Sequence, residues 1–258
     1  MKRLIATGVA LASLAVGVTA AAAATTVVVT PSNPQGWSTA DTRPGGAVGF
    51  VTDSTAPGGL GALQLTTDAT DAAKAQYMHA ASMQLSSVTE LSYQTKQISA
   101  SAAVGDPSYQ LAVELTGTRG FTTLVYEPYW NGAVVPGAWQ PWTVDAGSFW
   151  SSRTVTCPNG TITAGAGGPP LYTLEQVESM CPDATVVGFG VDVGTYNPSY
   201  DVEADLVDFA GTTYDFEPYV VAVVADQCKD MGWTTVARSD GSAFSNQGDC
   251  VSYVHTGR

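Results

Sequence analysis

Hydrophobic and polar residues alternate through the interior of the chain, which is the pattern of β-strands with one buried face. In residues 109–116 every second side chain is apolar, namely Tyr109, Leu111, Val113 and Leu115. A short turn with the sequence GTRG separates this segment from residues 121–130, which carry a similar pattern. The two segments therefore predict a β-hairpin.

The same alternation recurs along the chain. In residues 186–194, one face carries Val187, Phe189, Val191 and Val193, and the other carries glycines and Asp192. Shorter strands are predicted at 25–30, 61–67, 89–100, 201–210 and 212–218. Short strands at this spacing, with turn residues between them, predict an all-β protein, either an antiparallel sandwich or a barrel.

One short helix is predicted within residues 172–181. Thr173 can cap its N-terminus, and Gln176 stands at the position that completes a capping box. Pro182 ends the helix. Because the helix is short and reaches Cys181, we expect its role to be structural.

The first 24 residues have the order of a secretory signal peptide. Basic residues come first, an uncharged apolar stretch follows, and alanines complete the segment. The alternative is a membrane anchor, since an apolar run of about 20 residues can just span a bilayer. Its glycines and alanine-rich end favour cleavage before Thr25. We therefore expect a secreted, extracellular protein with no integral membrane segment after signal cleavage.

The mature chain divides into two parts by composition. Residues 25–224 carry the strand pattern and predict one sandwich domain. Residues 225–258 hold two cysteines, several glycine and asparagine turns, and a raised share of the basic residues. This segment predicts a small, disulfide-closed C-terminal appendage with a hairpin of its own.

The charge of the chain is strongly acidic. Ten Lys and Arg residues stand against 23 Asp and Glu residues, which gives a net charge of −13, and removal of Lys2 and Arg3 takes it to −15. A surface of this sign repels nucleic acid and anionic lipid. No nucleic acid is therefore expected among the partners.

All four cysteines lie in the exported part of the chain, where disulfides form. We expect two local pairs, Cys157 with Cys181 and Cys228 with Cys250, because each pair brackets a loop rich in turn residues. Zinc is the competing interpretation, but there is no Cys-x-x-Cys motif. Disulfides are therefore favoured.

The sequence favours a binding protein over an enzyme. Its only histidines are His79 and His255, and no Gly-x-Ser-x-Gly motif is present. If the predicted hairpin pairs Thr116 with Phe121, Glu114 and Glu127 stand about 13 Å apart, too far for the carboxyl pair of a glycosidase. Another pair, Glu127 with Asp192, depends on long-range strand pairing and stays open.

A calcium site is suggested by acidic residues in the later part of the chain. Asp201, Glu203 and Asp205 share one face of a predicted strand, and Asp192 precedes them. Hard oxygen ligands of this kind suit Ca²⁺, although no Asp-x-Asp-x-Asp-Gly loop is present. Solvated carboxylates are the alternative, and they are favoured. No other cofactor is suggested.

Four of the six tryptophans lie within residues 130–150, namely Trp130, Trp139, Trp142 and Trp150. Together with Tyr129, Asn131 and Gln140 they could form an aromatic platform for sugar rings, with polar groups beside it. The alternative is packing in the sandwich core, which also uses large aromatic side chains. Trp139 and Trp142 are three residues apart, so on a strand they point to opposite faces.

The order of several stretches resembles a domain of secreted bacterial proteins to which no activity is assigned. These stretches are 89–95, 121–130, 138–153, 172–177, 186–194 and 212–218. Residues 225–258 are similar to a short two-cysteine tail of exported bacterial proteins. The resemblance implies a jelly-roll-like β-sandwich, and it implies no catalytic or binding residue.

Together these features predict a secreted, non-catalytic binding module. The expected ligand is a carbohydrate or a glycan of the cell envelope, with the aromatic cluster as its contact. The alternatives are a structural or adhesive protein that binds a protein partner and, less favoured, an enzyme that cleaves polysaccharide.

Overall fold

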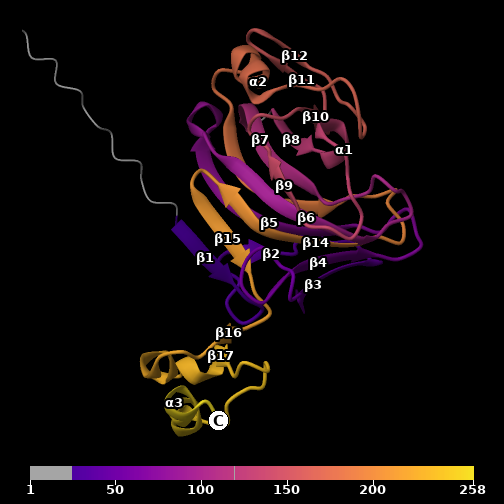
Figure 1. The fold of residues 1–258 in the computed structure, drawn as a ribbon. Helices are drawn as coiled ribbons and strands as arrows, with labels where there is room; N and C mark the ends of the chain where they lie inside the picture. The colour runs from indigo at the N-terminus through magenta and orange to yellow at the C-terminus, as the bar shows by residue number, and fades with distance from the viewer. Residues whose placement is uncertain (1–24, 119) are drawn as a thin grey trace, which may run out of the picture.

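The computed structural model describes residues 25–118 and 120–258, and its main body is a sandwich of two curled β-sheets (Figure 1). The predicted signal peptide, residues 1–24, lies outside the described residues. Almost all strand pairs are antiparallel, the exceptions being β1 with β15 and β16 with β17. The fold is thus the all-β, jelly-roll-like sandwich that the alternation and the resemblance predict.

The larger sheet is centred on β14 (Asp201–Phe209). Along one side of β14 lie β6 (Leu91–Ser99) and then β9 (Gln140–Thr143). On the other side of β14, one end pairs with β15 (Thr212–Phe216), which in turn pairs with β1 (Thr25–Val29). The other end of β14 pairs with β4 (Gly61–Thr67), which in turn pairs with β3 (Gly46–Thr52).

The smaller sheet has its longest strand, β7 (Ser108–Thr118), near the middle. In order across the sheet, its strands are β10 (Phe149–Ser151), β8 (Phe121–Tyr126), β7, β13 (Thr185–Val193), β5 (Ala75–Gln84) and β2 (Trp37–Ser38). The expected 109–116 and 186–194 strands are therefore neighbours. Strand β5 was not predicted, and it fills the space between β13 and β2.

The core lies between the inner faces of the two sheets. The apolar face predicted for β7 points into it, as Leu111 shows with an exposed fraction of 0 %. Phe189, Val191 and Val193 of β13 are buried as predicted, with Phe189 1 % exposed. A bulge between Val186 and Gly188 buries Val186 in place of Val187, which was expected on this face. Phe189 stacks on Phe209 of the opposite sheet with ring centroids 4.2 Å apart. Tyr109 donates its hydroxyl to the Asp208 carbonyl, 2.8 Å away, so a polar contact also joins the sheets.

The hairpin of β7 and β8 forms, but its register differs from the predicted one. Glu114 pairs with Phe121, where Thr123 was expected, because β7 continues to Thr118 and shortens the turn. A shift by two residues leaves the same side chains on each face. The predicted strand also ends early, since Pro128 begins the short helix α1 (Pro128–Asn131).

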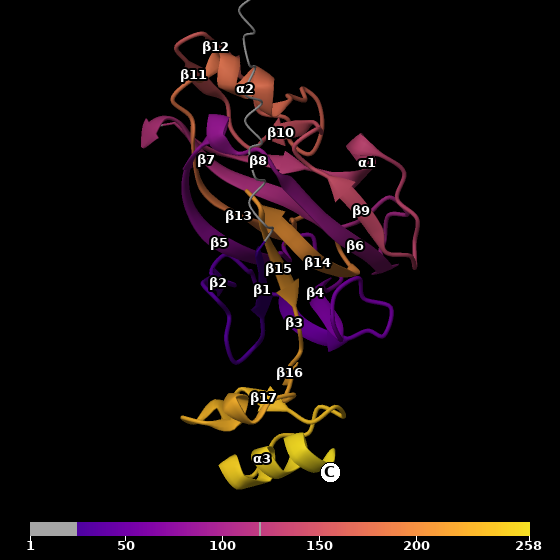
Figure 2. The same ribbon diagram turned by 60° about the vertical axis from the view of Figure 1, so that its left-hand side comes forward.

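A small cap covers one end of the sandwich, with α2 beside β11 and β12 in both ribbon views (Figures 1 and 2). The elements are α2 (Leu174–Met180), β11 (Val155–Cys157) and β12 (Gly160–Ile162). Thr173 and Gln176 form the predicted capping box. The disulfide Cys157–Cys181 ties the end of α2 to β11, as expected.

The C-terminal segment lies at the opposite end of the sandwich (Figure 2). Strand β16 (Val220–Val221) pairs with β17 (Val236–Ala237), and helix α3 (Gln247–Thr256) follows. Short 3-10 turns are η1 (Leu85–Ser87) in the sandwich, and η2 (Ala225–Cys228) and η3 (Gly232–Thr234) here. The predicted hairpin is replaced by α3, whose N-terminus is capped by Asn246.

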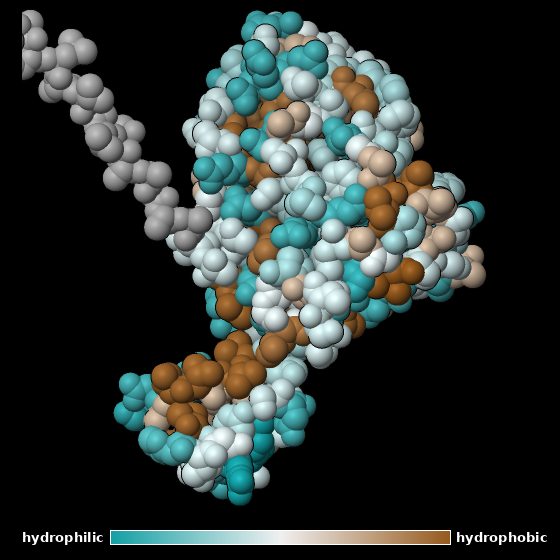
Figure 3. Space-filling model, in the orientation of Figure 1, coloured by the Kyte–Doolittle hydropathy of each residue, from teal (hydrophilic) through white to brown (hydrophobic). Residues whose placement is uncertain are grey.

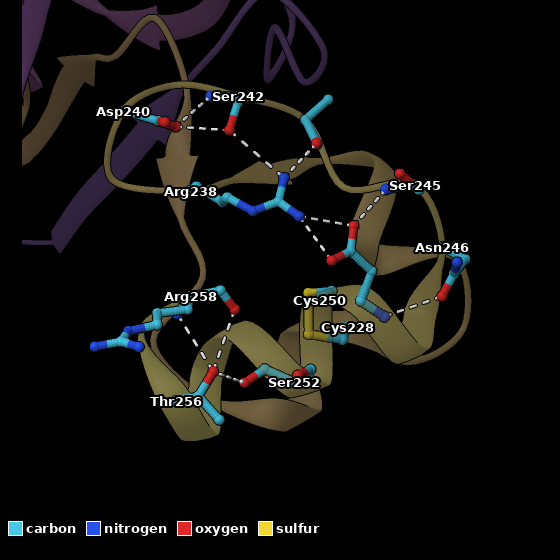
Figure 4. A network of polar contacts seen from close by, with 12 residues as sticks. Cys228, Arg238, Asp240, Ser242, Ser245, Asn246, Cys250, Ser252, Thr256 and Arg258 are labelled. Carbon is cyan, nitrogen blue, oxygen red and sulfur yellow. Dashed lines mark hydrogen bonds and ion pairs between the residues drawn. A yellow bond between two sulfur atoms is a disulfide. The ribbon is translucent and has the colours of Figure 1, made fainter.

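The segment has a hydrophobic cluster of its own around the disulfide Cys228–Cys250. Arg238 binds both carboxylate oxygens of Asp249 at 2.7 Å, and this ion pair holds the loop after β17 against α3 (Figure 4). Figure 3 shows apolar surface on this segment, where Val223 and Met231 are exposed. Both predicted disulfides are therefore present in the fold.

Candidate functional site

A pocket of about 520 Å³ opens at one end of the smaller sheet, on the face turned away from the core. Its floor is formed by Ser108 and Gln110 of β7 and by Asp192 of β13. These three residues alternate with the core residues Tyr109, Leu111 and Val191, so the same pattern that builds the core also places polar side chains on the outer face.

Strand register brings the floor residues together. Ser108 pairs directly with Asp192 across the ladder of β7 and β13, and Gln110 pairs with Gly190. Gln110 reaches diagonally and donates its side-chain amide to Asp192 Oδ2 over 2.6 Å. Lys74 Nζ lies 3.8 Å from the other carboxylate oxygen, Oδ1. The Asp192 carboxylate is thereby fixed in position at the bottom of the pocket.

One wall pairs a carboxyl group with an indole ring. Glu127 follows directly after β8, and Trp150 lies in the neighbouring strand β10 opposite Val125. Trp150 donates its indole N–H to Glu127 Oε1 over 3.4 Å. Both side chains line the pocket. The wall therefore presents an aromatic ring and a carboxyl oxygen side by side.

Tyrosines and loops complete the rim. Tyr129 of α1 lines the pocket and donates its hydroxyl to the Gly167 carbonyl over 2.8 Å. Tyr200 is buried beside the loop that holds Asp106, and Tyr196 stands 80 % exposed at the edge. Aromatic side chains thus surround a polar floor, with one of them free to contact a ligand from outside.

Burial changes the acidity of the wall carboxyl. Loss of water around Glu127 raises its pKa to about 7, and the nearby charges of Asp192 and Asp106 add to the rise. The hydrogen bond from Trp150 acts in the opposite direction. Glu127 is therefore poised between its protonated and charged forms near neutral pH.

The pKa values of the other two carboxyl groups of the pocket are raised in the same way. Burial raises the pKa of Asp192 to about 7, although Lys74 and Gln110 favour its charged form. Burial also raises the pKa of Asp106 to about 7, opposed by a hydrogen bond from Thr95. Oδ1 of each aspartate is buried and makes no hydrogen bond with the described residues. Each aspartate thus has one buried carboxylate oxygen without a hydrogen-bond donor among the described residues.

These features define the chemistry that the pocket can perform. It offers aromatic rings, three carboxyl groups and a buried amide, and no Lys or Arg is among its lining residues. Such a site can accept hydrogen bonds from a ligand rich in hydroxyl or amino groups while an aromatic ring packs on the ligand. It is unsuited to an anionic ligand, because no cation lines it.

The four clustered tryptophans do not form one platform. Trp150 lines the pocket with Tyr129, as a contact for a ligand would. Trp130 is 43 % exposed and donates to the Gly167 carbonyl, so it supports the rim from outside. Trp139 lies at the larger sheet, donates to Asp53 and stands apart from the pocket.

Trp142 is not available to a ligand, contrary to the prediction. It is 7 % exposed, belongs to the core cluster and donates its indole N–H to Thr95 over 2.7 Å. It lies on β9 and points inward, while Trp139 just before that strand does not. The spacing of three residues places the two rings on opposite faces, as the sequence indicates.

Asn131 and Gln140, also predicted to contact a ligand, have structural partners instead. Asn131 donates to the carbonyls of Glu127 and Ser148 and accepts from the Ser148 amide, so it closes the loop after α1. Gln140 accepts from the Val135 amide and donates to the Ala133 carbonyl. Their side-chain amides stabilise the loops by forming hydrogen bonds with backbone N–H and C=O groups of the loops.

The four acidic residues predicted for calcium are not gathered into one site. Asp192 belongs to the smaller sheet, whereas the other three lie on β14 of the larger sheet. Asp201 accepts from Gln64, Glu203 lies 3.7 Å from Lys96, and Asp205 accepts from the amides of Phe216 and Gly58. Within the described residues, no group of three or more His, Cys, Asp or Glu side chains is placed to hold a metal ion.

Several pocket residues were not predicted, namely Asp106, Ser108, Gln110, Tyr196 and Tyr200. Gln110 could have been found, because it lies on the polar face of a clearly amphipathic strand. Glu127 and Asp192 were considered as a pair, and the structure places both in the pocket. The loop residues Asp106 and Tyr196 carry no sequence pattern that would mark them.

No protein-family model matches the chain, and no curated protein matches its sequence. Among solved structures, it is similar to a Family 11 carbohydrate-binding module from Clostridium thermocellum in complex with a β-1,3-1,4-mixed-linked tetrasaccharide. That match has a TM-score of 0.40 and 12 % identity, and it covers 69 % of this chain and 90 % of that one. The Family 11 module of a cellulosomal cellulase from the same organism gives the same score over 70 % of this chain and 89 % of that one.

A β-1,2-glucanase from Parabacteroides distasonis is also similar, with a TM-score of 0.33 and 12 % identity over 65 % of this chain. The match covers 22 % of the glucanase. Likenesses of this strength concern the general sandwich architecture and say nothing about a ligand. Among the described residues, no helix is long and apolar enough to cross a membrane.

Proposed function

We propose that this protein is a secreted, non-catalytic module that binds a glycan, with the pocket at the end of the smaller sheet as its binding site. The observation that carries the proposal is the pairing of Trp150 with Glu127 in a pocket that also holds Tyr129 and Asp192. Sugar rings have an apolar face and a rim of hydroxyl groups. An aromatic ring beside carboxylate acceptors matches both parts.

The ligand is proposed to be extracellular, and a cell-envelope glycan is the class we favour. Two disulfides, an acidic chain and a predicted signal peptide support an extracellular location. The pocket is large enough for about one or two sugar rings, since pockets of 300–1,000 Å³ hold small ligands of that size. A longer glycan would extend past Tyr196 at the rim.

The experiment is retention of the purified protein on insoluble cellulose, chitin and peptidoglycan, with tryptophan fluorescence followed during binding. The test variant is Trp150→Ala, and the matched control is Trp139→Ala. Both tryptophans are half-buried and donate their indole N–H to a carboxylate, but only Trp150 lines the pocket.

Loss of retention in Trp150→Ala alone supports the proposal. Equal retention of wild type and both variants on a glycan would place binding elsewhere on the surface. No retention of the wild type on any of these glycans would contradict glycan binding and favour a protein partner.

The carboxyl groups of the pocket favour a second candidate function, the cleavage of polysaccharide. Glu127 and Asp192 line the same pocket, and a glycosidase requires two carboxyl groups, one of them protonated at the working pH. An enzyme would release new reducing ends from the glycan during the same incubations. Both Glu127→Gln and Asp192→Asn should then abolish this release.

A further inference from the structure

We infer that the pocket selects glycans whose sugars carry free amino groups, as in an oligomer of glucosamine. This inference rests on the proposed glycan-binding function and specifies the class of sugar. It starts from the balance of charge in the pocket: Asp106, Glu127 and Asp192 line it, and no basic side chain does.

Two of these carboxyl groups have no cation beside them in the described part of the chain. The side chain of Glu127 accepts only the indole N–H of Trp150, and that of Asp106 accepts only the hydroxyl of Thr95. Neither carboxyl group takes part in a salt bridge between described residues. A buried carboxylate without a partner is costly, so a cationic ligand would be favoured at this position.

The floor of the pocket holds a carboxylate that is only partly satisfied by hydrogen bonds. Asp192 is 4 % exposed, and its Oδ2 accepts from Gln110, but its Oδ1 makes no hydrogen bond. Lys74 Nζ lies 3.8 Å from Oδ1, which is too far for a hydrogen bond. Oδ1 of Asp106 is likewise buried and without a donor. Two of the carboxylate oxygens on pocket-lining residues are therefore buried without a hydrogen-bond donor from the described part of the chain.

An ammonium group matches this arrangement better than a hydroxyl group. It brings three donors and a positive charge, whereas a hydroxyl brings one donor and no charge. The rings of Trp150 and Tyr129 line the same pocket, and aromatic faces attract cations. The same rings also suit the apolar face of a sugar, which a simple metal ion lacks.

The acidity of the three carboxyl groups makes the inference measurable by pH. Burial raises the pKa of each to about 7, and a bound cation would favour the charged form. The carboxyl groups are therefore expected to release protons when the ligand binds near neutral pH. The titratable and charged groups that face this trio are Asp41, Arg43, Lys74, Tyr93, Tyr129 and Tyr200. Lys74 and Arg43 act on Asp192 and leave the other two carboxyl groups uncompensated.

The test is isothermal titration of the purified protein with three matched hexamers: glucosamine, N-acetylglucosamine and cellohexaose. Each titration is run in two buffers of different ionisation enthalpy, so that proton release is counted. The variants are Glu127→Gln and Asp192→Asn. The control is Glu114→Gln, because Glu114 lies on the same face of β7 but does not line the pocket.

We expect the glucosamine hexamer to bind about 10- to 100-fold more tightly than the N-acetylated one, with proton release that falls in Glu127→Gln. Glu114→Gln should bind as wild type does. Equal affinity for all three hexamers, with Trp150→Ala impaired, would overturn the amine preference and leave glycan binding intact.

Binding of none of the hexamers would overturn both proposals. A lysine hexamer that binds as tightly as the glucosamine hexamer would show that the pocket recognises positive charge and not an amino sugar, which also contradicts the inference. Identical proton exchange in wild type and Glu127→Gln would contradict the role given to the carboxyl groups.

Discussion

The indole N–H of Trp150 lies 3.4 Å from Oε1 of Glu127, at the point where β10 and the end of β8 run side by side. This contact fixes the carboxyl group against an aromatic ring at the mouth of a pocket whose floor is equally acidic. Burial raises the pKa of Glu127 to about 7. Ligand binding at this carboxyl group and the free energy of unfolding are therefore both expected to depend on pH.

Glu127→Gln is expected to stabilise the protein at pH 8 and to have little effect at pH 4. The ordinary pKa of 4.5 applies in the unfolded chain, and the folded value is about 7. Below pH 4.5 the group is protonated in both states. As pH rises from 4.5 to 7, the unfolded chain releases a proton that the folded chain retains, so the free energy of unfolding falls.

Glutamine keeps the shape and the acceptor for Trp150 but cannot ionise. Urea unfolding of wild type and Glu127→Gln at pH 4 and pH 8 should therefore diverge by about 1–3 kcal/mol at the higher pH, in favour of the variant. Glu114→Gln, with a carboxyl group outside the pocket, is the control. Parallel pH profiles for wild type and Glu127→Gln would contradict the raised pKa.

Trp142→Ala is expected to destabilise the sandwich strongly. The ring is buried in the core and its N–H donates to Thr95, so truncation leaves a cavity and removes the donor to the Thr95 hydroxyl oxygen. The expected loss is about 3–5 kcal/mol in urea or thermal unfolding. Trp130→Ala, at a ring that is 43 % exposed, should cost about 1 kcal/mol or less. Similar losses for both variants would contradict the assignment of Trp142 to the core.

Tyr109→Phe tests the polar contact between the two sheets. The variant removes a hydroxyl that donates to the Asp208 carbonyl across the core, and it leaves that buried acceptor without its partner. The expected loss is about 1–2 kcal/mol in the free energy of unfolding. Tyr126→Phe is the control, since its buried ring makes no side-chain hydrogen bond to the described residues, and it should change stability by about 0.5 kcal/mol or less.

We propose that the C-terminal segment from β16 onward folds independently of the sandwich, because it has its own disulfide, strand pair and hydrophobic cluster. Replacing Cys228 and Cys250 with serine should unfold this segment alone, since a loop of this length gains about 3 kcal/mol from its disulfide. Limited proteolysis followed by mass spectrometry should then remove the C-terminal segment and leave a resistant core.

The matched variant replaces Cys157 and Cys181, which tie α2 to the sandwich. It should lower the thermal stability of the main body and leave the C-terminal segment intact. Loss of the whole fold in the Cys228 and Cys250 variant would show that the two parts depend on each other.

The amino-acid sequence by itself determined the parts of this protein that depend on local pattern. Alternation of apolar residues predicted β7 and β13, Thr173 and Gln176 predicted the cap of α2, and cysteine spacing favoured the two disulfides that are present. These features are readable because their physical cause lies within a few residues of the chain or in one short loop.

The tertiary structure decided what the pocket contains. Asp192 and Glu127 are far apart in sequence, and only the pairing of β13 with β7 and of β7 with β8 brings them to one end of a sheet. It also decided that Trp142 is buried while Trp150 faces a pocket, because burial depends on which sheet covers each face. Long-range strand register has no signature in local sequence, so the site could be seen only once the sheets were assembled.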